Sequence, residues 1–197
     1  MVRHGETDWN QSRRLQGGNT DTQLNQEGWQ QAESVALRLK PERIKSIYSS
    51  PLQRARDTAQ AIARYHKVEV EIEPTLREID AAALEGTPLD ELQGHLDQLL
   101  TGDEAIFKSY GGESLAELQQ RVWGTIQRLV NKHDKGGLVI VSHYFAIMSI
   151  ICAVLNLPLS QIGRLKLGAG SISIITFDER GTRLILFNDT CHLASTE

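Results

Sequence analysis

Two histidines and two arginines stand in this sequence where predicted strands or helices meet polar segments. Arg3 and His4 follow the first two residues, Arg54 lies near the start of a predicted helix, and His143 follows a continuous apolar run. The planar guanidinium group of arginine matches the oxygens of a phosphoryl group in pairs. A neutral histidine nitrogen can attack phosphorus, and nearby positive charge keeps the ring neutral by lowering its pKa. The pattern therefore predicts an anion site with a histidine nucleophile.

Glu78 lies in the polar segment 75–86 and is the best candidate for a proton donor. A departing alkoxide needs a proton, which a carboxyl group supplies when burial or neighbouring negative charge keeps it protonated. Gly5 permits a tight backbone after His4, so that a carbonyl oxygen can bind the second ring nitrogen and fix the tautomer. Taken singly, such a histidine or glutamate is more often structural or solvated, so the prediction depends on these groups meeting.

The elements that would position these groups alternate between helices and strands. Apolar residues recur at helical spacing in five segments, which we predict to be helices. They are 25–40, a segment that starts with Pro51 as the first helical residue, 89–100, 114–133 and 145–155. Strands are predicted at 44–48, 68–72 and 138–142, with a C-terminal hairpin at 171–177 and 184–187. This order predicts an α/β fold: a three-layer sandwich with a mainly parallel central sheet flanked by helices, in one domain over residues 1–197.

The carboxyl ends of three predicted strands carry the polar residues. In open α/β sheets ligands bind beyond these ends, so the segments 3–4, 49–50 and 142–143 are expected to converge in one crevice. The first strand is short, because only two residues precede Arg3, whereas a strand usually has about five. Two interpretations stay open: the strand is this short, or residues upstream of Met1 are missing from the sequence.

Length and composition exclude several classes of protein. The 197 residues suit one ordinary domain, with 40% hydrophobic and 23% charged residues. The net charge of −4 argues against nucleic acid as a partner, and the longest apolar run, 145–155, is too short to cross a membrane. No secretory signal is visible, so we expect a cytoplasmic protein with Cys152 and Cys191 as reduced thiols.

Several short motifs follow one another along nearly the whole chain. They are Arg3-His4-Gly5-Glu6-Thr7 with Trp9-Asn10, Ser50-Pro51-Leu52-Gln53-Arg54-Ala55 with Thr58-Ala59, Leu76-Arg77-Glu78-Ile79-Asp80 with Glu85-Gly86, Gly111-Gly112-Glu113-Ser114, and Val141-Ser142-His143. In this order they resemble the signature of the histidine phosphatase superfamily, the phosphoglycerate-mutase-like clan. One Arg-His-Gly tripeptide is weak evidence, whereas the ordered set is specific.

The resemblance implies a role for each matching position. His4 would be the nucleophile that becomes phosphorylated, and Glu78 would protonate the leaving group and then assist the attacking water. Arg3, Arg54 and His143 would bind and stabilise the transferring phosphoryl group. The implied substrate contacts are Arg3, Asn10, Gln16, Gly17, Arg54 and His143. Such chemistry needs neither a metal nor another cofactor, and its partner is a small phosphorylated metabolite.

Two places depart from the family pattern. The segment Ala81-Ala82-Ala83-Leu84 replaces an aromatic residue, a glycine and a tryptophan, which would widen the pocket or loosen the loop. Tyr144 replaces the glycine that usually follows the histidine of the last motif. It would crowd the pocket or offer its hydroxyl group to the substrate, and we count it among the substrate-binding residues.

The leading functional prediction is a phosphomonoesterase that hydrolyses small phosphorylated metabolites. The segment between Glu78 and Gly111 leaves little room for the lid that mutases of this clan carry. A phosphoglycerate-type phosphomutase is the alternative, and a catalytically weak phosphometabolite-binding protein on the same fold is a third interpretation. The sequence leaves the ester that is cleaved open. The apolar C-terminal hairpin offers an edge for a homodimer.

Overall fold

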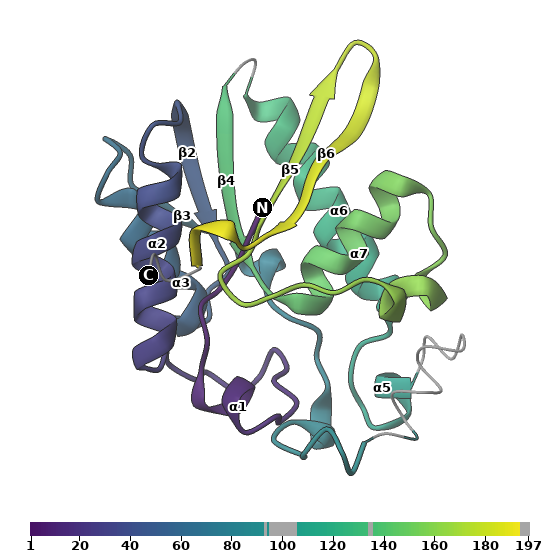
Figure 1. Ribbon diagram of the computed structural model, residues 1–197. Helices are drawn as coiled ribbons and strands as arrows, with labels where there is room; N and C mark the ends of the chain where they lie inside the picture. The colour runs from purple at the N-terminus through teal and green to yellow at the C-terminus, as the bar shows by residue number, and fades with distance from the viewer. Residues whose placement is uncertain (93, 95–105, 134–135, 194–197) are drawn as a thin grey trace.

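The structure, a computed structural model, describes residues 1–92, 94, 106–133 and 136–193, and a six-stranded sheet runs through its centre (Figure 1). The strands are β1 (Val2–Arg3), β2 (Ile44–Ser49), β3 (Val70–Ile72), β4 (Gly137–Ser142), β5 (Ile172–Asp178) and β6 (Gly181–Asp189). Their order across the sheet is β3-β2-β4-β1-β5-β6. The first four strands run parallel, and β5 and β6 are antiparallel to their neighbours. The predicted mainly parallel sheet is therefore confirmed.

Helices cover both faces of this sheet, as the three-layer prediction requires (Figure 1). The longer ones are α2 (Gln26–Leu39) and α3 (Gln53–Ala63) on one face, and α6 (Leu115–Lys132) and α7 (Tyr144–Leu155) on the other. Shorter helical turns are α1 (Asp8–Gln11), α5 (Ile106–Ser109) and the 3-10 helices Pro74–Leu76, Ala82–Leu84, Leu159–Arg164 and Cys191–Leu193. No helix among the described residues is both long and apolar enough to cross a membrane.

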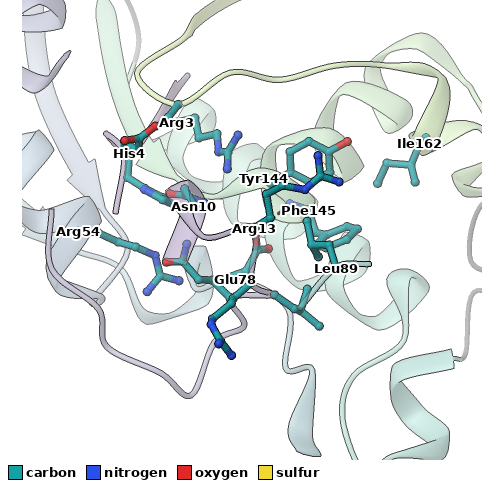
Figure 2. Close-up of a pocket in the computed structure, with 16 residues that line it drawn as sticks. Arg3, His4, Asn10, Arg13, Arg54, Glu78, Leu89, Tyr144, Phe145 and Ile162 are labelled. Atoms are coloured by element: carbon teal, nitrogen blue, oxygen red, sulfur yellow. Dashed lines mark hydrogen bonds between the residues drawn. The ribbon is translucent and has the colours of Figure 1, made fainter. Parts of the chain in front are cut away.

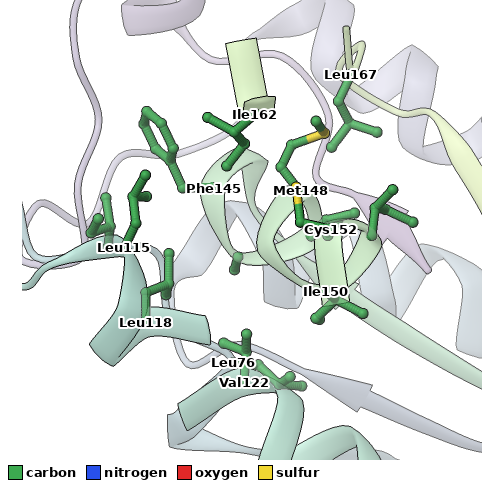
Figure 3. Packing of buried hydrophobic residues seen from close by; sticks show 14 of the residues in the cluster. Leu76, Leu115, Leu118, Val122, Phe145, Met148, Ile150, Cys152, Ile162 and Leu167 are labelled. Carbon is green, nitrogen blue, oxygen red and sulfur yellow. The ribbon is translucent and has the colours of Figure 1, made fainter. Parts of the chain in front are cut away.

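Alternate residues of the central strands enter two apolar clusters, one on each face. Val139 and Val141 pack toward α2 and α3, whereas Ile140 between them packs toward α6 and α7. Successive side chains of a strand point to opposite faces, so a strand covered on both sides reads as a continuous apolar run. Figure 3 shows the cluster on the α6 and α7 side, which includes Leu118 and Val122 of α6.

The predicted helix starts agree with the structure where a side chain caps the helix. The Asn25 side chain accepts a hydrogen bond from the Gly28 N–H and begins α2. Ser114 and Glu117 form a reciprocal capping box that begins α6. These short-range hydrogen bonds satisfy N–H groups that the first turn of a helix leaves without a partner, which is why the sequence locates them well.

The helix predicted to begin at Pro51 begins later, so that prediction was wrong by two residues. The Ser50 hydroxyl accepts a hydrogen bond from the Leu52 N–H at 3.3 Å, and Leu52 itself is extended, with φ −72° and ψ 138°. The chain therefore turns once more before α3 starts at Gln53. As a result Arg54 is the second residue of the helix.

The segment 75–86, predicted to be a loop, contains parts of two 3-10 helices, Pro74–Leu76 and Ala82–Leu84. The helix predicted at 89–100 falls mostly on residues outside those that the structure describes. The hairpin is confirmed as β5 and β6, with β6 at the edge of the sheet. Cys152 and Cys191 are both free thiols.

Candidate active site

The carboxyl ends of β1, β2 and β4 meet at a cavity of about 510 Å³. The predicted site residues that line it are Arg3, His4, Asn10, Gln16, Arg54, Glu78 and Tyr144, joined by apolar side chains such as Leu15, Leu89, Phe145 and Ile162 (Figure 2). His143 and Gly17 are not among the lining residues. The convergence expected from the topology is therefore present.

The backbone of His4 is fixed by the strands on either side of it. Its N–H donates to the Ser142 carbonyl and its own carbonyl accepts the Gly170 N–H, both at 3.1 Å. The ring nitrogen Nδ1 lies 2.7 Å from the Gly5 carbonyl oxygen. Because a carbonyl oxygen only accepts hydrogen bonds, Nδ1 carries the proton and Nε2 keeps its lone pair. The His4 ring is thus held as the tautomer suited to nucleophilic attack.

The charge state of His4 follows from its surroundings. Burial lowers its pKa well below the ordinary value, and the nearby positive charges of Arg54 and Arg3 lower it further. The hydrogen bond to Gly5 acts in the opposite direction and is the smaller effect. The ring is therefore neutral at physiological pH, as nucleophilic attack requires.

Arg54 is fully buried and is held by the loop that follows α1. Its Nη2 donates to the Gly17 carbonyl at 3.0 Å, and its Nη1 donates to the Thr20 carbonyl at 2.9 Å. Burial lowers its pKa to about 10, which still leaves it charged at neutral pH. Its Nε has no partner among the described residues. Gly17, for which a contact with substrate stays a prediction, contributes a carbonyl that orients Arg54.

Arg3 reaches the cavity from the end of β1 and is held at its rim. Its Nη1 donates to the Leu167 carbonyl at 2.6 Å, and its guanidinium carbon lies 5.4 Å from the centre of the Tyr144 ring. A guanidinium at this distance is attracted to the face of an aromatic ring. The Tyr144 hydroxyl in turn lies 3.4 Å from the Leu165 carbonyl. Tyr144 therefore supports Arg3 and forms a wall of the cavity.

His143 is fully buried beside His4, with 5.1 Å between the ring centres. Its Nε2 lies 2.7 Å from the Ser50 hydroxyl oxygen, while Nδ1 has no partner among the described residues. Burial, followed by the charge of Arg54, lowers the His143 pKa well below the ordinary value. A buried ring nitrogen without a partner is the kind of group that a bound anion satisfies.

Glu78 is buried against the first turn of α7, which follows His143. Its Oε1 accepts N–H groups from Ile79 at 2.9 Å and Ala146 at 3.1 Å, and its Oε2 accepts the Phe145 N–H at 3.1 Å. Burial raises its pKa above the ordinary value despite these hydrogen bonds and the charge of Arg54. Oε1 already accepts two bonds, so Oε2 is the oxygen with capacity for a proton.

Two amides complete the polar wall of the cavity. Asn10 uses its Oδ1 to accept from the Thr7 N–H and hydroxyl, at 3.2 and 3.1 Å, which leaves its Nδ2 as a donor. Gln16 uses its Oε1 to accept from Thr22 at 2.7 Å, and its buried Nε2 has no partner among the described residues. Both amides thus have donors available for an anionic ligand.

Glu85 is a residue that the sequence reasoning missed. Its Oε1 accepts the Asn19 N–H at 3.1 Å, and its Oε2 accepts the Thr20 hydroxyl at 2.6 Å. It thereby ties down the loop whose carbonyls hold Arg54. Ser50, which holds His143, was also missed. Both residues belong to the quoted motifs, and their place there was the available signal.

The alanine segment 81–83 does not line the cavity. Ala81 is fully buried, and the Ala82 N–H donates to an Asp80 carboxylate oxygen at 2.8 Å. That this departure widens the pocket or loosens the loop stays a prediction. Among the described residues, no group of three or more His, Cys, Asp or Glu side chains is placed to hold a metal.

The family to which this chain belongs follows from its sequence profile. The profile of the histidine phosphatase superfamily (branch 1) matches residues 1–190. The chain belongs to this superfamily. The chain is an enzyme of the hydrolase class.

Individual relatives support this membership over nearly the full length. Phosphoserine phosphatase 1 of Hydrogenobacter thermophilus is 34% identical, over 98% of this chain and 92% of that protein. A probable phosphoglycerate mutase of Salmonella paratyphi A is 36% identical, over 91% of this chain and 84% of that protein. The crystal structure of a phosphoserine phosphatase from Entamoeba histolytica, in complex with 3-phosphoglyceric acid, superimposes with a TM-score of 0.88 at 33% identity, covering 98% of this chain and 97% of that one.

Proposed function

We propose that this histidine phosphatase hydrolyses small phosphate monoesters through a phosphohistidine formed on His4. The observation that carries the proposal is the His4 ring, buried and neutral, with Nδ1 bonded to the Gly5 carbonyl and Nε2 left with its lone pair. Arg3 and Arg54 supply positive charge on the same cavity. A developing phosphoryl charge is stabilised best by donors fixed in advance.

The first chemical step transfers the phosphoryl group to the enzyme. The Nε2 lone pair of His4 forms a bond to phosphorus while the ester P–O bond breaks. Arg3, Arg54 and the free Nδ1 of His143 bind the phosphoryl oxygens, with Asn10 and Gln16 donating from their amides. The leaving alkoxide takes a proton from Oε2 of Glu78, which burial keeps protonated to higher pH than an exposed glutamate.

The second step regenerates the enzyme. The Glu78 carboxylate takes a proton from a water molecule, whose oxygen then forms a bond to phosphorus. The bond between phosphorus and Nε2 breaks, so that inorganic phosphate leaves and His4 returns to its neutral form. The same carboxyl group thus serves as acid and then as base.

Trapping the intermediate tests this proposal. The enzyme is mixed with phosphoserine, quenched at alkaline pH where phosphohistidine is stable, and digested for mass spectrometry. We expect one phosphoryl group on the peptide that contains His4, and none in a His4→Ala variant whose circular dichroism matches the parent. A phosphoryl group on another residue, or full turnover by His4→Ala, contradicts the mechanism.

The substrate is proposed to carry a second anionic group. Arg13 and Arg14 line the cavity in addition to the two arginines assigned to the phosphoryl group, and 510 Å³ suits a small metabolite. Turnover of 3-phosphoglycerate and of glycerol phosphate compares two esters that differ in a carboxylate. We expect a higher kcat/KM for 3-phosphoglycerate, and equal values contradict the second anion site.

A phosphomutase is the second candidate, because a relative 36% identical over 91% of the chain is a probable phosphoglycerate mutase. Incubation with 3-phosphoglycerate separates the two activities. Release of inorganic phosphate supports the phosphatase. Formation of 2-phosphoglycerate without inorganic phosphate supports the mutase and overturns our proposal. A catalytically weak phosphometabolite-binding protein stays a third candidate, and an absence of turnover on a panel of phosphate esters, with retained binding of them, would favour it.

The homodimer stays a prediction, and we propose β6 as the strand through which two copies pair. β6 is the edge strand of the sheet, and Ile185 on it is 58% exposed. Exposed edge strands pair readily with another copy. Light scattering measures the mass in solution, and a dimer that Ile185→Lys converts to a monomer supports pairing through β6.

A further inference from the structure

Arg13 lies at the rim of the active-site cavity with an unusual backbone conformation. Its φ is +53°, in the left-handed region that a residue with a Cβ atom rarely adopts. Two backbone bonds hold it there, because the Arg13 N–H donates to the Asn10 carbonyl at 3.1 Å and the Arg13 carbonyl accepts the Leu89 N–H at 2.8 Å. Such strain persists only where the surrounding structure maintains it. The backbone therefore fixes the point on the rim from which the Arg13 side chain extends.

The Arg13 guanidinium group has one partner, and it comes from the opposite side of the rim. Arg13 and Leu89 both line the cavity (Figure 2). Asp90, the residue after Leu89, accepts a hydrogen bond from Nη2 of Arg13 at its Oδ1, at 3.1 Å. Within the described part of the chain this is the single hydrogen bond of the Arg13 side chain. A guanidinium group has five N–H donors, so Asp90 uses only part of its capacity.

The ion pair between Arg13 and Asp90 is easy to exchange, because both side chains lie mostly in water. The exposed fraction is 69% for the Arg13 side chain and 80% for that of Asp90. Such a pair gains little, since water solvates both charges nearly as well. An anion inside the cavity meets Arg13 beside the apolar side chains of Leu89 and Phe145, where a lower local dielectric strengthens the attraction. Arg13 therefore gains more from such an anion than from Asp90.

Arg14, the neighbouring arginine, is bound to the backbone instead. Its Nη1 donates to the Gly86 carbonyl at 2.7 Å, and its own backbone pairs with Pro88. These bonds join the loop that follows α1 to the segment 86–88. Arg14 thus fastens the rim, whereas Arg13 is bound to a side chain that can turn away.

We propose that Arg13 is the specificity-determining residue for a carboxylate on the alcohol part of the substrate, and that Asp90 is its counter-ion until that carboxylate displaces it. This inference rests on the proposed function, because it concerns an ester bound in the His4 cavity. Asp90 competes with the substrate carboxylate for the same guanidinium group. An ester without a second anionic group leaves the ion pair intact, so the pair discriminates between esters by the charge of their alcohol part.

Binding of two esters tests this proposal. 3-Phosphoglycerate and glycerol 3-phosphate differ in one carboxylate, and isothermal titration calorimetry in a His4→Ala background measures both Kd values without dependence on turnover. The readout is the Kd of glycerol 3-phosphate divided by that of 3-phosphoglycerate. We expect Arg13→Gln to lower this ratio about fivefold or more, because the cation is lost. Asp90→Asn should raise it about two- to fivefold, because the internal competitor is lost.

Matched controls separate this ion pair from general electrostatics. Arg14→Gln removes the same charge as Arg13→Gln from the next residue, and Glu91→Gln removes the same charge as Asp90→Asn from the next residue. Each control is expected to change the ratio by less than about twofold. When Arg13→Gln is already present, adding Asp90→Asn should have no effect on the ratio, because Asp90 acts through Arg13.

Several results would overturn the proposal. An unchanged ratio in Arg13→Gln or in Asp90→Asn does so, and so does an equal change in the matched control. A rise on Asp90→Asn that persists without Arg13 also contradicts it. None of these results bears on the phosphatase mechanism, which is tested by the phosphoryl group on His4. Conversely, the absence of that phosphoryl group contradicts the phosphatase mechanism and leaves the Kd ratios as a valid test of Arg13.

Discussion

The two ends of the central sheet differ in what holds their residues in place. At the carboxyl end, charged side chains are buried and each is bound by groups from other loops, as Arg54 is by the Gly17 and Thr20 carbonyls. At the amino end, a second cavity of about 690 Å³ is lined by residues of β4 and β5, and the Met1 amine donates one bond to the Ser173 carbonyl. The carboxyl end thus depends on particular side chains, whereas the amino end depends on backbone pairing and burial.

This difference indicates which substitutions each end of the sheet tolerates. Removing one partner of a buried charged group leaves the other without compensation, which is costly. Apolar packing is less selective, since residues of similar volume replace one another at moderate cost. Substitutions at the carboxyl end are therefore expected to act on activity and, where they leave a buried charge without its partner, on stability as well. Changes at the amino end are expected to act on stability.

The largest effect is expected from His4→Ala, which removes the proposed nucleophile. Turnover of a phosphate ester should fall by about 10⁴-fold or more, while the melting temperature changes little, because Ser142 and Gly170 bond only to the His4 backbone. Steady-state kinetics and thermal unfolding measured on the same preparation check this. A loss of stability as large as the loss of activity would place His4 among structural residues instead.

Glu78→Gln tests the proton donor at the same end of the sheet. We expect kcat to fall by about 10²–10⁴-fold with an alkyl ester, and much less with p-nitrophenyl phosphate, whose leaving group needs no proton. Burial raises the Glu78 pKa, so the parent is active at low pH and loses activity as pH rises through that pKa. A pH profile of kcat/KM in which the variant keeps the same alkaline limb would exclude Glu78 as the acid.

Glu85→Gln tests a side chain that affects the site only by holding the loop that orients Arg54. Its carboxylate bonds to Asn19 and Thr20, whose loop orients Arg54. We expect a loss of roughly tenfold in kcat/KM, because one charge-assisted bond is weakened, with the pH profile unchanged. The exposed Glu42→Gln is the matched control and should have no effect. If both variants behave alike, the loop does not depend on Glu85.

The smallest effect is expected on the pH dependence of stability, through the Met1 amine at the amino end of the sheet. Burial lowers the pKa of the Met1 amine from 8.0 to about 5, so between these values the unfolded chain binds a proton that the folded chain does not. Stability therefore falls as pH decreases from 8 to 5. Acetylation of the amine should remove this part of the dependence and raise the melting temperature by a few degrees at pH 5.5.

His4 and His143, at the carboxyl end, also make stability depend on pH, but independently of the Met1 amine. Their lowered pKa values make stability fall below about pH 6.5 in acetylated and free chains alike. Thermal unfolding of both forms from pH 8 to 5 separates the two contributions. Parallel curves for the two forms would mean that the Met1 amine is hydrated in the folded protein.

Local signals in the sequence predicted much of the fold. Asn25 and Ser114 mark helix starts because their side chains bond within three residues, and the apolar run before His143 marks a strand covered on both faces. Pro51 misled the prediction, since the Ser50 hydroxyl bonds the Leu52 N–H and delays α3. Proline favours the first position of a helix, but here the hydrogen bond from the Leu52 N–H to the Ser50 hydroxyl outweighs that preference.

The sequence by itself determined which residues stand at the strand ends and which motifs they form, so it named most of the polar groups that line the cavity. Only the tertiary structure decided how they are held. Glu78 meets the first turn of α7 across 67 residues of chain, and His143 meets Ser50 across 93. Contacts over such separations leave no periodic pattern, because periodicity records the geometry of one element and not the packing of two.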